Sequence, residues 1–373
     1  MDKKSLDKSQ KISYNKGRMS LWERKAELLL MKYIAILGFG VVGGGVYDVL
    51  KDNPGVEIKH ILDLRTFPGH PLADRVTTDL DKILTDTDVE VVVETLGGVE
   101  LAYKFSKQAI LAGKSVVTSN KAVVDAHGKE LEELALEKGV SYLYEASVGG
   151  GIPIIRPLRD CFTADRITKI TGILNGTTNY ILTRMADTGC SMEEALKEAQ
   201  ALGYAEQDPT ADVEGYDTAR KICILAGLAF GVTVPYTAIP HLEGIRGVTK
   251  EDIACAKEAG YSIKLLGKAE KVGDRVRLIV APCLVPADSM LAAVRMVFNA
   301  ISVTADAVGE VVFYGQGAGS LPTASAVACD ILEALSRKPL PSPRPACEDG
   351  FVVKDLSDER TVTLANGKTY FAI

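Results

Sequence analysis

The run Tyr33-Ile34-Ala35-Ile36-Leu37-Gly38-Phe39-Gly40-Val41-Val42-Gly43 decides the fold of the amino-terminal half of the chain. An apolar strand leads directly into a G-x-G-x-x-G turn, and a helix is predicted to continue to about residue 50. The first two glycines allow a tight turn that can approach a pyrophosphate, and the third lets helix and strand pack closely. The helix N-terminus adds amides and a positive dipole end. We therefore expect a dinucleotide-binding turn, rather than a merely structural one, formed by Gly38, Phe39, Gly40, Val41, Val42 and Gly43.

The strand predicted over 58–62 ends at Asp63, twenty residues after Gly43. An acid at this place accepts hydrogen bonds from the adenosine ribose, which favours NAD. Arg65 is close enough to contact a 2′-phosphate, which favours NADP. The sequence leaves the choice between NAD and NADP open.

Strands and helices continue to alternate after this acid. Further strands are predicted over 89–93, 115–118 and 141–144, with helices over about 101–112 and 127–138. This spacing predicts an α/β fold with a Rossmann-type, doubly wound parallel sheet.

Two polar segments follow strands of this predicted sheet, Thr95-Leu96-Gly97-Gly98 and Ser119-Asn120-Lys121. Both lie at carboxyl ends of strands, where open α/β sheets bind ligands. We expect Thr95 to contact the cofactor and Lys121 to lie near its nicotinamide. The alternative for Lys121 is an ordinary surface lysine.

The pattern changes after Gly149-Gly150-Gly151. Hairpins are predicted over 263–281, turning near Gly273, and over 301–314. Short turns between strands indicate a second α+β domain with a mixed or antiparallel sheet. Other elements predicted in this half are a strand over 167–174 and a helix that Thr177 or Thr178 can cap and that runs to about 187. A helix over 192–201, helices opening at Thr249 and Pro322, and a hairpin over 361–373 are also predicted.

A second decisive stretch is Asp212-Val213-Glu214-Gly215-Tyr216-Asp217-Thr218-Ala219-Arg220-Lys221. It predicts a helix capped near Asp212, with Asp217 and Lys221 on one face. The turns that follow are apolar on nearly every side, so we expect the helix to be buried. Burial favours the neutral amine of Lys221 and Asp217 favours the charged form, a balance that suits proton exchange near neutral pH. A structural ion pair is the alternative.

Composition narrows the class of protein. The 373 residues carry a net charge of −6, which argues against nucleic acid as the main partner. Seven cysteines without a C-x-x-C motif suit a reducing cytoplasm, and four histidines form no metal-spaced cluster. The apolar run over 28–46 is interrupted by Lys32 and glycines, which favours a strand and turn over a membrane anchor.

Several motifs together resemble the homoserine dehydrogenase family, in order from about residue 31 to 337. They are the glycine turn, Ser119-Asn120-Lys121-Ala122, the stretches 145–154, 172–182 and 203–206, the stretch 208–217 with Lys221, and Tyr314-Gly315-Gln316-Gly317-Ala318-Gly319 with Pro322-Thr323-Ala324-Ser325. The resemblance implies reversible, NAD(P)-dependent oxidation of L-homoserine to L-aspartate 4-semialdehyde, on the route to threonine, methionine and isoleucine.

The resemblance also implies roles for single residues. Lys221 is expected to be the general acid/base. Substrate contacts are expected from Glu206, Asp212, Asp217 and Lys121, and further cofactor contacts from Gly203, Gly317 and Gly319. An alkali cation, Na⁺, is expected to bind Glu145, Val148, Gly150 and Ile152, a carboxylate with backbone carbonyls. The alternative for this last stretch is a glycine-rich hinge, and the two are compatible.

The resemblance further implies a homodimer formed through the second domain's sheet. The family often has an arginine where this chain has Leu62, which argues against a preference for NADP. The 36 residues after Arg337 are too few for the amino-acid-sensing ACT domain of many bacterial members. Feedback inhibition by threonine through such a domain is therefore not expected.

We divide the chain into five segments. They are a loosely ordered extension (1–30), an NAD(P)-binding domain (31–160), a substrate-binding and dimerisation domain (161–315), a helix returning to the cofactor domain (316–337), and a proline-rich linker with a hairpin (338–373). Two other functions stay open on the residues alone. One is another lysine-dependent NAD(P) oxidoreductase, such as a sugar dehydrogenase, and the other is a non-catalytic dinucleotide sensor.

Overall fold

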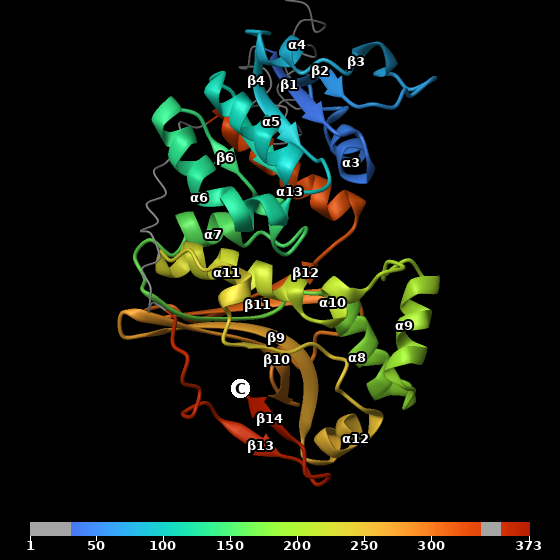
Figure 1. Ribbon diagram of the computed structural model, residues 1–373, viewed down its shortest axis with the longest axis vertical. Coiled ribbons are helices and arrows are strands. Elements are labelled where there is room, and N and C mark those ends of the chain that lie inside the picture. The colour runs from blue at the N-terminus through green and yellow to red at the C-terminus, as the bar shows by residue number, and fades with distance from the viewer. Residues whose placement is uncertain (1–30, 337–351) are drawn as a thin grey trace, which may run out of the picture.

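The computed structural model describes residues 31–336 and 352–373, which form two lobes, each built around one sheet (Figure 1). The extension expected over 1–30 and the proline-rich linker expected after residue 337 lie outside these ranges. In the described part of the chain, no helix has the length and apolar character that crossing a membrane demands.

The upper lobe in Figure 1 contains a parallel sheet with the strand order β3-β2-β1-β4-β5-β6. The chain changes direction across this sheet between β1 and β4, the switch point at which doubly wound sheets bind ligands. The predicted Rossmann-type sheet is confirmed. Its strands are β1 Lys32–Leu37, β2 Val56–Leu62, β3 Val76–Thr77, β4 Val89–Glu94, β5 Ser115–Thr118 and β6 Tyr142–Leu143.

Helices cover both faces of this sheet, which explains why its central strands are continuous apolar runs. One face packs against α5 and α6, and the other against α3 and α13. Ala324, Val327 and Ile331 of α13 are buried in that second layer, so a helix that follows the lower sheet in the chain completes the first lobe. The helices of this lobe are α3 Val41–Leu50, α4 Asp81–Leu84, α5 Glu100–Leu111, α6 Lys121–Lys138 and α13 Ser320–Ser336.

The lower lobe contains a mixed sheet, as predicted, with the strand order β12-β11-β7-β9-β10-β14-β13 and β8 beside β10. Neighbours from β12 to β10 pair antiparallel, whereas β8 and β14 run parallel to β10. The strands are β7 Ile167–Ile173, β8 His241–Leu242, β9 Tyr261–Val272, β10 Arg275–Pro286, β11 Phe298–Ala305, β12 Gly309–Gln316, β13 Thr361–Thr363 and β14 Thr369–Ala372. Between the two sheets lie α7 Ile155–Asp160 and α11 Tyr216–Phe230. The other helices of the lower lobe are α8 Gly176–Thr188, α9 Met192–Ala201, α10 Thr210–Val213 and α12 Lys250–Glu258.

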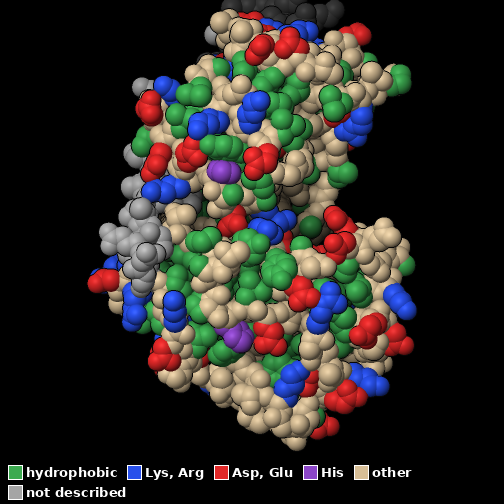
Figure 2. Space-filling view, in the orientation of Figure 1, with side chains coloured by type: hydrophobic (Ala, Val, Ile, Leu, Met, Phe, Trp, Pro, Cys, Tyr) green, Lys and Arg blue, Asp and Glu red, His purple; other side chains and the backbone are tan. Residues whose placement is uncertain are grey.

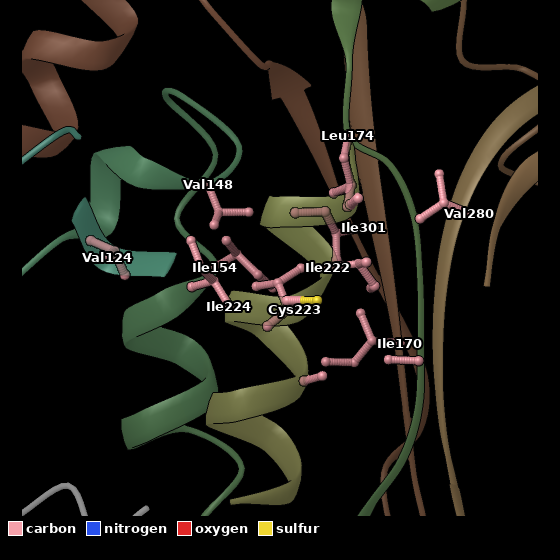
Figure 3. Close-up of a cluster of buried hydrophobic side chains, with 14 of the residues drawn as sticks. Val124, Val148, Ile154, Ile170, Leu174, Ile222, Cys223, Ile224, Val280 and Ile301 are labelled. Atoms are coloured by element: carbon pink, nitrogen blue, oxygen red, sulfur yellow. The ribbon is translucent and has the colours of Figure 1, made fainter. Parts of the chain in front are cut away.

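Helix α11 lies between the two lobes and is buried, as its apolar sequence predicts. Figure 3 shows its side chains Ile222, Cys223 and Ile224 among apolar side chains of both lobes. The first lobe contributes Val124 from α6, and the lower sheet contributes residues such as Ile301. The helix therefore fixes any polar side chain on its first turn at the junction of the lobes.

Three predicted helix starts are wrong, each for a local reason. Helix α6 begins at Lys121 rather than 127, because the Asn120 side chain accepts hydrogen bonds from the amides of Ala122 and Val123. Helix α8 is capped by Asn175 rather than Thr177 or Thr178, since Asn175 accepts from Thr178 N.

The third concerns Asp212, which does not cap the long helix. It lies in the short helix α10, and Gly215, with φ 82°, separates α10 from α11. That left-handed conformation favours glycine, and it turns the chain so that α11 starts at Tyr216.

Candidate active site

The glycine turn has the geometry of a dinucleotide-binding turn. Gly38 adopts φ 88°, and its amide donates to Leu62 O at 2.8 Å. A Cβ on Gly43 would lie 2.3 Å from Gly38 O, so only glycine lets α3 begin this close to β1. A Cβ on Gly40 would meet nothing within 4 Å, so the turn faces open space that a pyrophosphate can enter.

Asp63 closes the same turn from the neighbouring strand. Its Oδ2 accepts from Phe39 N at 2.8 Å, and both carboxylate oxygens pair with the Arg65 guanidinium at 2.9 and 2.8 Å. Hydrogen bonds from Arg65 hold the pKa of Asp63 well below its usual range, although burial opposes this. The acid and the arginine expected to meet the ribose therefore form one unit.

Thr95 pins the glycine turn to the end of β4. Its hydroxyl donates to Gly38 O at 2.6 Å, and its amide donates to Leu37 O at 2.9 Å. The residue before it, Glu94, is fully buried and accepts from Leu96 N at 2.7 Å and from the Thr118 hydroxyl at 2.5 Å. Burial raises the pKa of Glu94.

Asn120 joins the ends of β4 and β5. Its Nδ2 donates to Gly98 O at 2.7 Å, while its Oδ1 caps α6. Lys121, the first residue of α6, extends across the junction and pairs with Asp217 Oδ1 at 2.9 Å. The coulombic attraction of Asp217 raises the pKa of Lys121. The structure thus brings two of the predicted residues together from different lobes.

Asp217 lies between two lysines at the start of α11. Lys221 donates to Asp217 Oδ2 at 2.7 Å and to Leu174 O at 2.7 Å. Both residues are buried, with 4% of Asp217 and 8% of Lys221 exposed. Burial opposes ionisation of Asp217, but Lys221 and Lys121 hold its pKa well below the usual range. The carboxylate is therefore a fixed negative charge shared by two ammonium groups.

Asp212 belongs to the same cluster through Asn175. The Asn175 Nδ2 donates to Asp212 Oδ1 at 2.6 Å and to Asp217 Oδ2 at 2.9 Å. Burial, followed by repulsion from Asp217, raises the pKa of Asp212. A second cation close to Asp212 would relieve this cost, which makes the site suitable for an ammonium ligand.

Glu206 and Gly203 lie after α9, and both are exposed. Gly203 adopts φ 75°, while Gln200 donates to Glu206 O at 3.1 Å. The Thr177 hydroxyl donates to Tyr204 O at 2.7 Å, which ties this segment to the start of α8. No hydrogen bond joins the Glu206 carboxylate to any other described residue, so it is free to receive a ligand.

Glu145 does not point into open space but caps α7. Its Oε1 accepts from Ile154 N at 2.6 Å and Ile155 N at 2.8 Å, and its Oε2 accepts from Arg156 N at 2.7 Å. Its amide donates to the buried Asp330 of α13 at 2.7 Å. This loop is therefore held by backbone donors on one side and by the returning helix on the other.

Gly317 lies against the same loop, and Gly319, with φ 115°, follows two residues later. A Cβ on Gly150, which adopts φ 56°, would lie 2.5 Å from the carbonyl carbon of Gly317. Gly151 N donates to Gln316 O at 3.1 Å. The predicted cation stretch and the final glycine motif therefore meet where the chain crosses from the lower sheet to α13.

Figure 2 shows the surface hollowed between the lobes, with acidic and basic side chains gathered there. The hollow can hold a ligand between a dinucleotide turn and a buried acid–lysine cluster. This combination defines a class: an NAD(P)-dependent oxidoreductase acting on a CH–OH group.

Comparisons with known proteins identify the family. Residues 38–145 match the model described as "Homoserine dehydrogenase, NAD binding domain", and residues 153–332 match "Homoserine dehydrogenase". The chain belongs to the homoserine dehydrogenase family. It interconverts L-homoserine and L-aspartate 4-semialdehyde with NAD(P).

Two relatives show the extent of the similarity. The homoserine dehydrogenase of Synechocystis is 46% identical over 317 residues, which cover 81% of this chain and 73% of that one. The Bacillus subtilis enzyme is 44% identical, with coverage of 81% and 72%.

Two solved structures extend the similarity to the fold. A homoserine dehydrogenase from Thiobacillus denitrificans superposes with a TM-score of 0.79 at 40% identity, covering 86% of this chain and 80% of that one. A hyperthermophilic archaeal homoserine dehydrogenase in complex with NADPH gives 0.71 at 26% identity, covering 84% and 100%.

Sequence reasoning missed two residues of the site, Asn175 and Glu94. Asn175 directly follows a strand, and asparagine outranks threonine as a helix cap, so this signal was available. Glu94 stands at the end of an apolar strand, where a buried acid is a rare occurrence. The hydrogen bonds that both make connect distant segments, so spacing alone could not show them.

Proposed function

We propose that Lys221 is the general acid/base of the reaction. Its ammonium uses two of three N–H groups on Asp217 and Leu174 O, which leaves one to face a substrate oxygen. In the reducing direction this group gives its proton to the aldehyde oxygen of the semialdehyde. In the oxidising direction the neutral amine takes the proton of the homoserine hydroxyl. The bound nicotinamide supplies the hydride chemistry.

We further propose that Asp217 and Lys121 position the reacting groups. Asp217 keeps both lysines oriented by accepting from each, at 2.7 and 2.9 Å. Because Lys121 starts from the carboxyl edge of the parallel sheet, it reaches from the nicotinamide side of the switch point toward the substrate. The ion pair between Lys121 and Asp217 therefore orders the site across the two lobes.

The substrate's ammonium group is proposed to bind Glu206 and Asp212. One carboxylate oxygen of Asp212 accepts a hydrogen bond from Asn175. Burial raises the pKa of Asp212, so a bound cation would favour its ionised form. Glu206 offers an exposed carboxylate in the segment between α9 and α10. Two acidic side chains select an amino acid over a simple alcohol.

For the cofactor, we propose contacts from the glycine turn, Thr95, Gly203, Gly317 and Gly319, with Asp63 and Arg65 at the adenosine ribose. The Arg65 guanidinium is already placed by Asp63, with an exposed fraction of 61% for its side chain. It can therefore approach a 2′-phosphate without leaving its partner, and this supports use of NADP as well as NAD.

An alkali cation, Na⁺, is also proposed, because the loop after Glu145 offers suitable donors. Val148, Gly150 and Ile152 are buried, and within the described residues no hydrogen bond reaches their carbonyl oxygens. Glu145 Oε2 keeps acceptor capacity beyond its bond from Arg156 N. These four oxygens would hold the ion, which would brace the loop against Gly317.

We propose that the enzyme is a cytoplasmic homodimer of the threonine, methionine and isoleucine route, divided at about residues 31–160, 161–315 and 316–337. The dimer is proposed to form through the lower sheet. Support comes from β12, an edge strand of the described sheet, where Tyr314 is 57% exposed and stacks on Phe298. Sedimentation at several concentrations tests it, and a monomer throughout would refute it.

The observation that carries the proposed function is the Lys221–Asp217–Lys121 cluster between the lobes, in which Asp217 and Lys221 are buried. Absorbance of the reduced cofactor should change with homoserine and either NADP or NAD. Lys221→Ala should lose turnover by about 10²- to 10⁴-fold, while fluorescence titration with NADPH gives an unchanged Kd. Lys257→Met, at an exposed lysine of α12, is the control. Near-normal turnover of Lys221→Ala would remove Lys221 from the mechanism.

A further inference from the structure

Glu94 is a buried acid to which none of the roles above is assigned. It ends β4, beside the switch point of the sheet, and has no exposed surface. Placing a carboxylate there is costly unless each oxygen is hydrogen-bonded. Both oxygens are: Oε1 accepts from Leu96 N at 2.7 Å and Oε2 from the Thr118 hydroxyl at 2.5 Å.

These two hydrogen bonds join the segment after β4 to the end of β5. Leu96 belongs to the segment that Thr95 pins to the glycine turn. Thr118 ends β5 and, through the same hydroxyl, accepts from Asn120 N at 2.9 Å. One carboxylate therefore fixes both strand ends that carry the nicotinamide side of the site.

The connection continues from Thr118 to Lys121. Asn120 bridges back to Gly98 O at 2.7 Å and caps α6, so its position decides where α6 starts. Lys121 is the first residue of that helix, and its Nζ lies 2.9 Å from Asp217. A shift of Thr118 and Asn120 would thus move Lys121 relative to Asp217.

We propose that Glu94 is a positioning residue that sets where Lys121 lies by holding Thr118 and the Leu96 backbone together. The inference rests on the proposed role of Lys121. It predicts that loss of one Glu94 bond acts on turnover only through Lys121. Glutamine at this position fills the same space but can keep only one of the two acceptors, because its amide nitrogen is a donor.

A double-mutant cycle tests this, since residues in one network give non-additive effects. We expect Glu94→Gln to lower kcat by about 10- to 100-fold, the range for a misplaced group, with the substrate KM changing less. In a Lys121→Met background the same substitution should lower kcat by less than about twofold further. Glu90→Gln, an exposed acid on the same strand, is the matched control and should leave kcat unchanged.

The outcomes separate the two proposals. Equal losses from Glu94→Gln with and without Lys121 would overturn the role of Glu94 and leave that of Lys121 standing. Wild-type turnover of Lys121→Met would overturn both. Should Glu94→Gln fail to fold by circular dichroism, Thr118→Val cuts the same connection, and Thr118→Ser should restore kcat. Failure of serine to restore it would count against the proposal.

Discussion

The two lobes build their halves of the site by different means. In the upper lobe the candidate site is a backbone turn, in which a side chain on Gly43 would clash with Gly38 O and one on Gly40 would face open space. In the lower lobe it is a pair of buried charges, Asp217 and Lys221, and Lys121 of the upper lobe reaches Asp217 across the junction. A site made of backbone requires residues that have no side chain, whereas a site made of charges requires every charged partner. Substitutions in the upper lobe should therefore impair cofactor binding, and substitutions in the lower lobe should impair turnover.

The largest effect is expected for Asp217→Asn in the lower lobe. The amide cannot hold two ammonium groups, so both lysines lose their orientation, and kcat should fall by at least about 100-fold. NADPH affinity should stay within about twofold, as judged by fluorescence titration. Asp274→Asn, in the turn between β9 and β10, provides the comparison. Strong loss of NADPH affinity would show that the two lobes are not separable in this way.

Gly43→Ala should give the opposite result in the upper lobe. The added methyl group would lie 2.3 Å from Gly38 O, so the turn must move. We expect Kd for NADPH to rise by at least about tenfold, with a smaller change in kcat at saturating cofactor. Gly44→Ala, one residue later with nothing within 4 Å, should bind normally. Normal NADPH binding by Gly43→Ala would show that the turn tolerates the added methyl group.

Asn175→Ala should raise the KM for homoserine by about tenfold, because Asp212 and Asp217 lose their shared donor. It also removes the cap of α8, so stability will fall as well. Asn175→Ser keeps a cap but cannot bridge both acids. The substrate effect is therefore read from the serine variant by steady-state kinetics. If serine restores KM fully, the bridge is unimportant.

The pKa of Asp212, raised by burial, gives a pH dependence to substrate binding. The ammonium of homoserine needs the ionised carboxylate, so binding weakens as pH falls through a pKa above the usual aspartate range. The substrate KM should rise severalfold toward acid, whereas Kd for NADPH should not follow. Asp212→Asn should flatten this dependence. An unchanged pH profile in that variant would assign the titration to another group.

The smallest effect is expected at a residue outside both halves of the site. Ser191→Ala removes the capping box of α9, in which Ser191 and Glu194 satisfy each other's amides. It should cost about 1 kcal/mol of unfolding free energy and leave kcat unchanged. Urea unfolding and steady-state kinetics measure the two. A clear loss of kcat would mean that α9 contributes directly to the site.

The same contrast explains what could be predicted from the sequence. The glycine spacing, the strand–helix alternation and the buried start of α11 are local patterns, and the structure agrees with them. The reach of Lys121 to Asp217 and the bridge from Asn175 join residues about 40 to 100 positions apart, which no periodicity encodes. The start of α6 also depends on one side chain, because Asn120 accepts hydrogen bonds from the first amides of that helix.

The crossing of α13 into the upper lobe has a consequence for synthesis on the ribosome. Strands β1 to β6 emerge early, but the layer that buries Ile34, Ile36 and Val93 waits for Ala324, Val327 and Ile331. The lower lobe emerges in between, so it can fold before α13 covers the upper sheet. A nascent chain arrested shortly after residue 160 should consequently be a substrate for chaperones rather than a finished nucleotide-binding module.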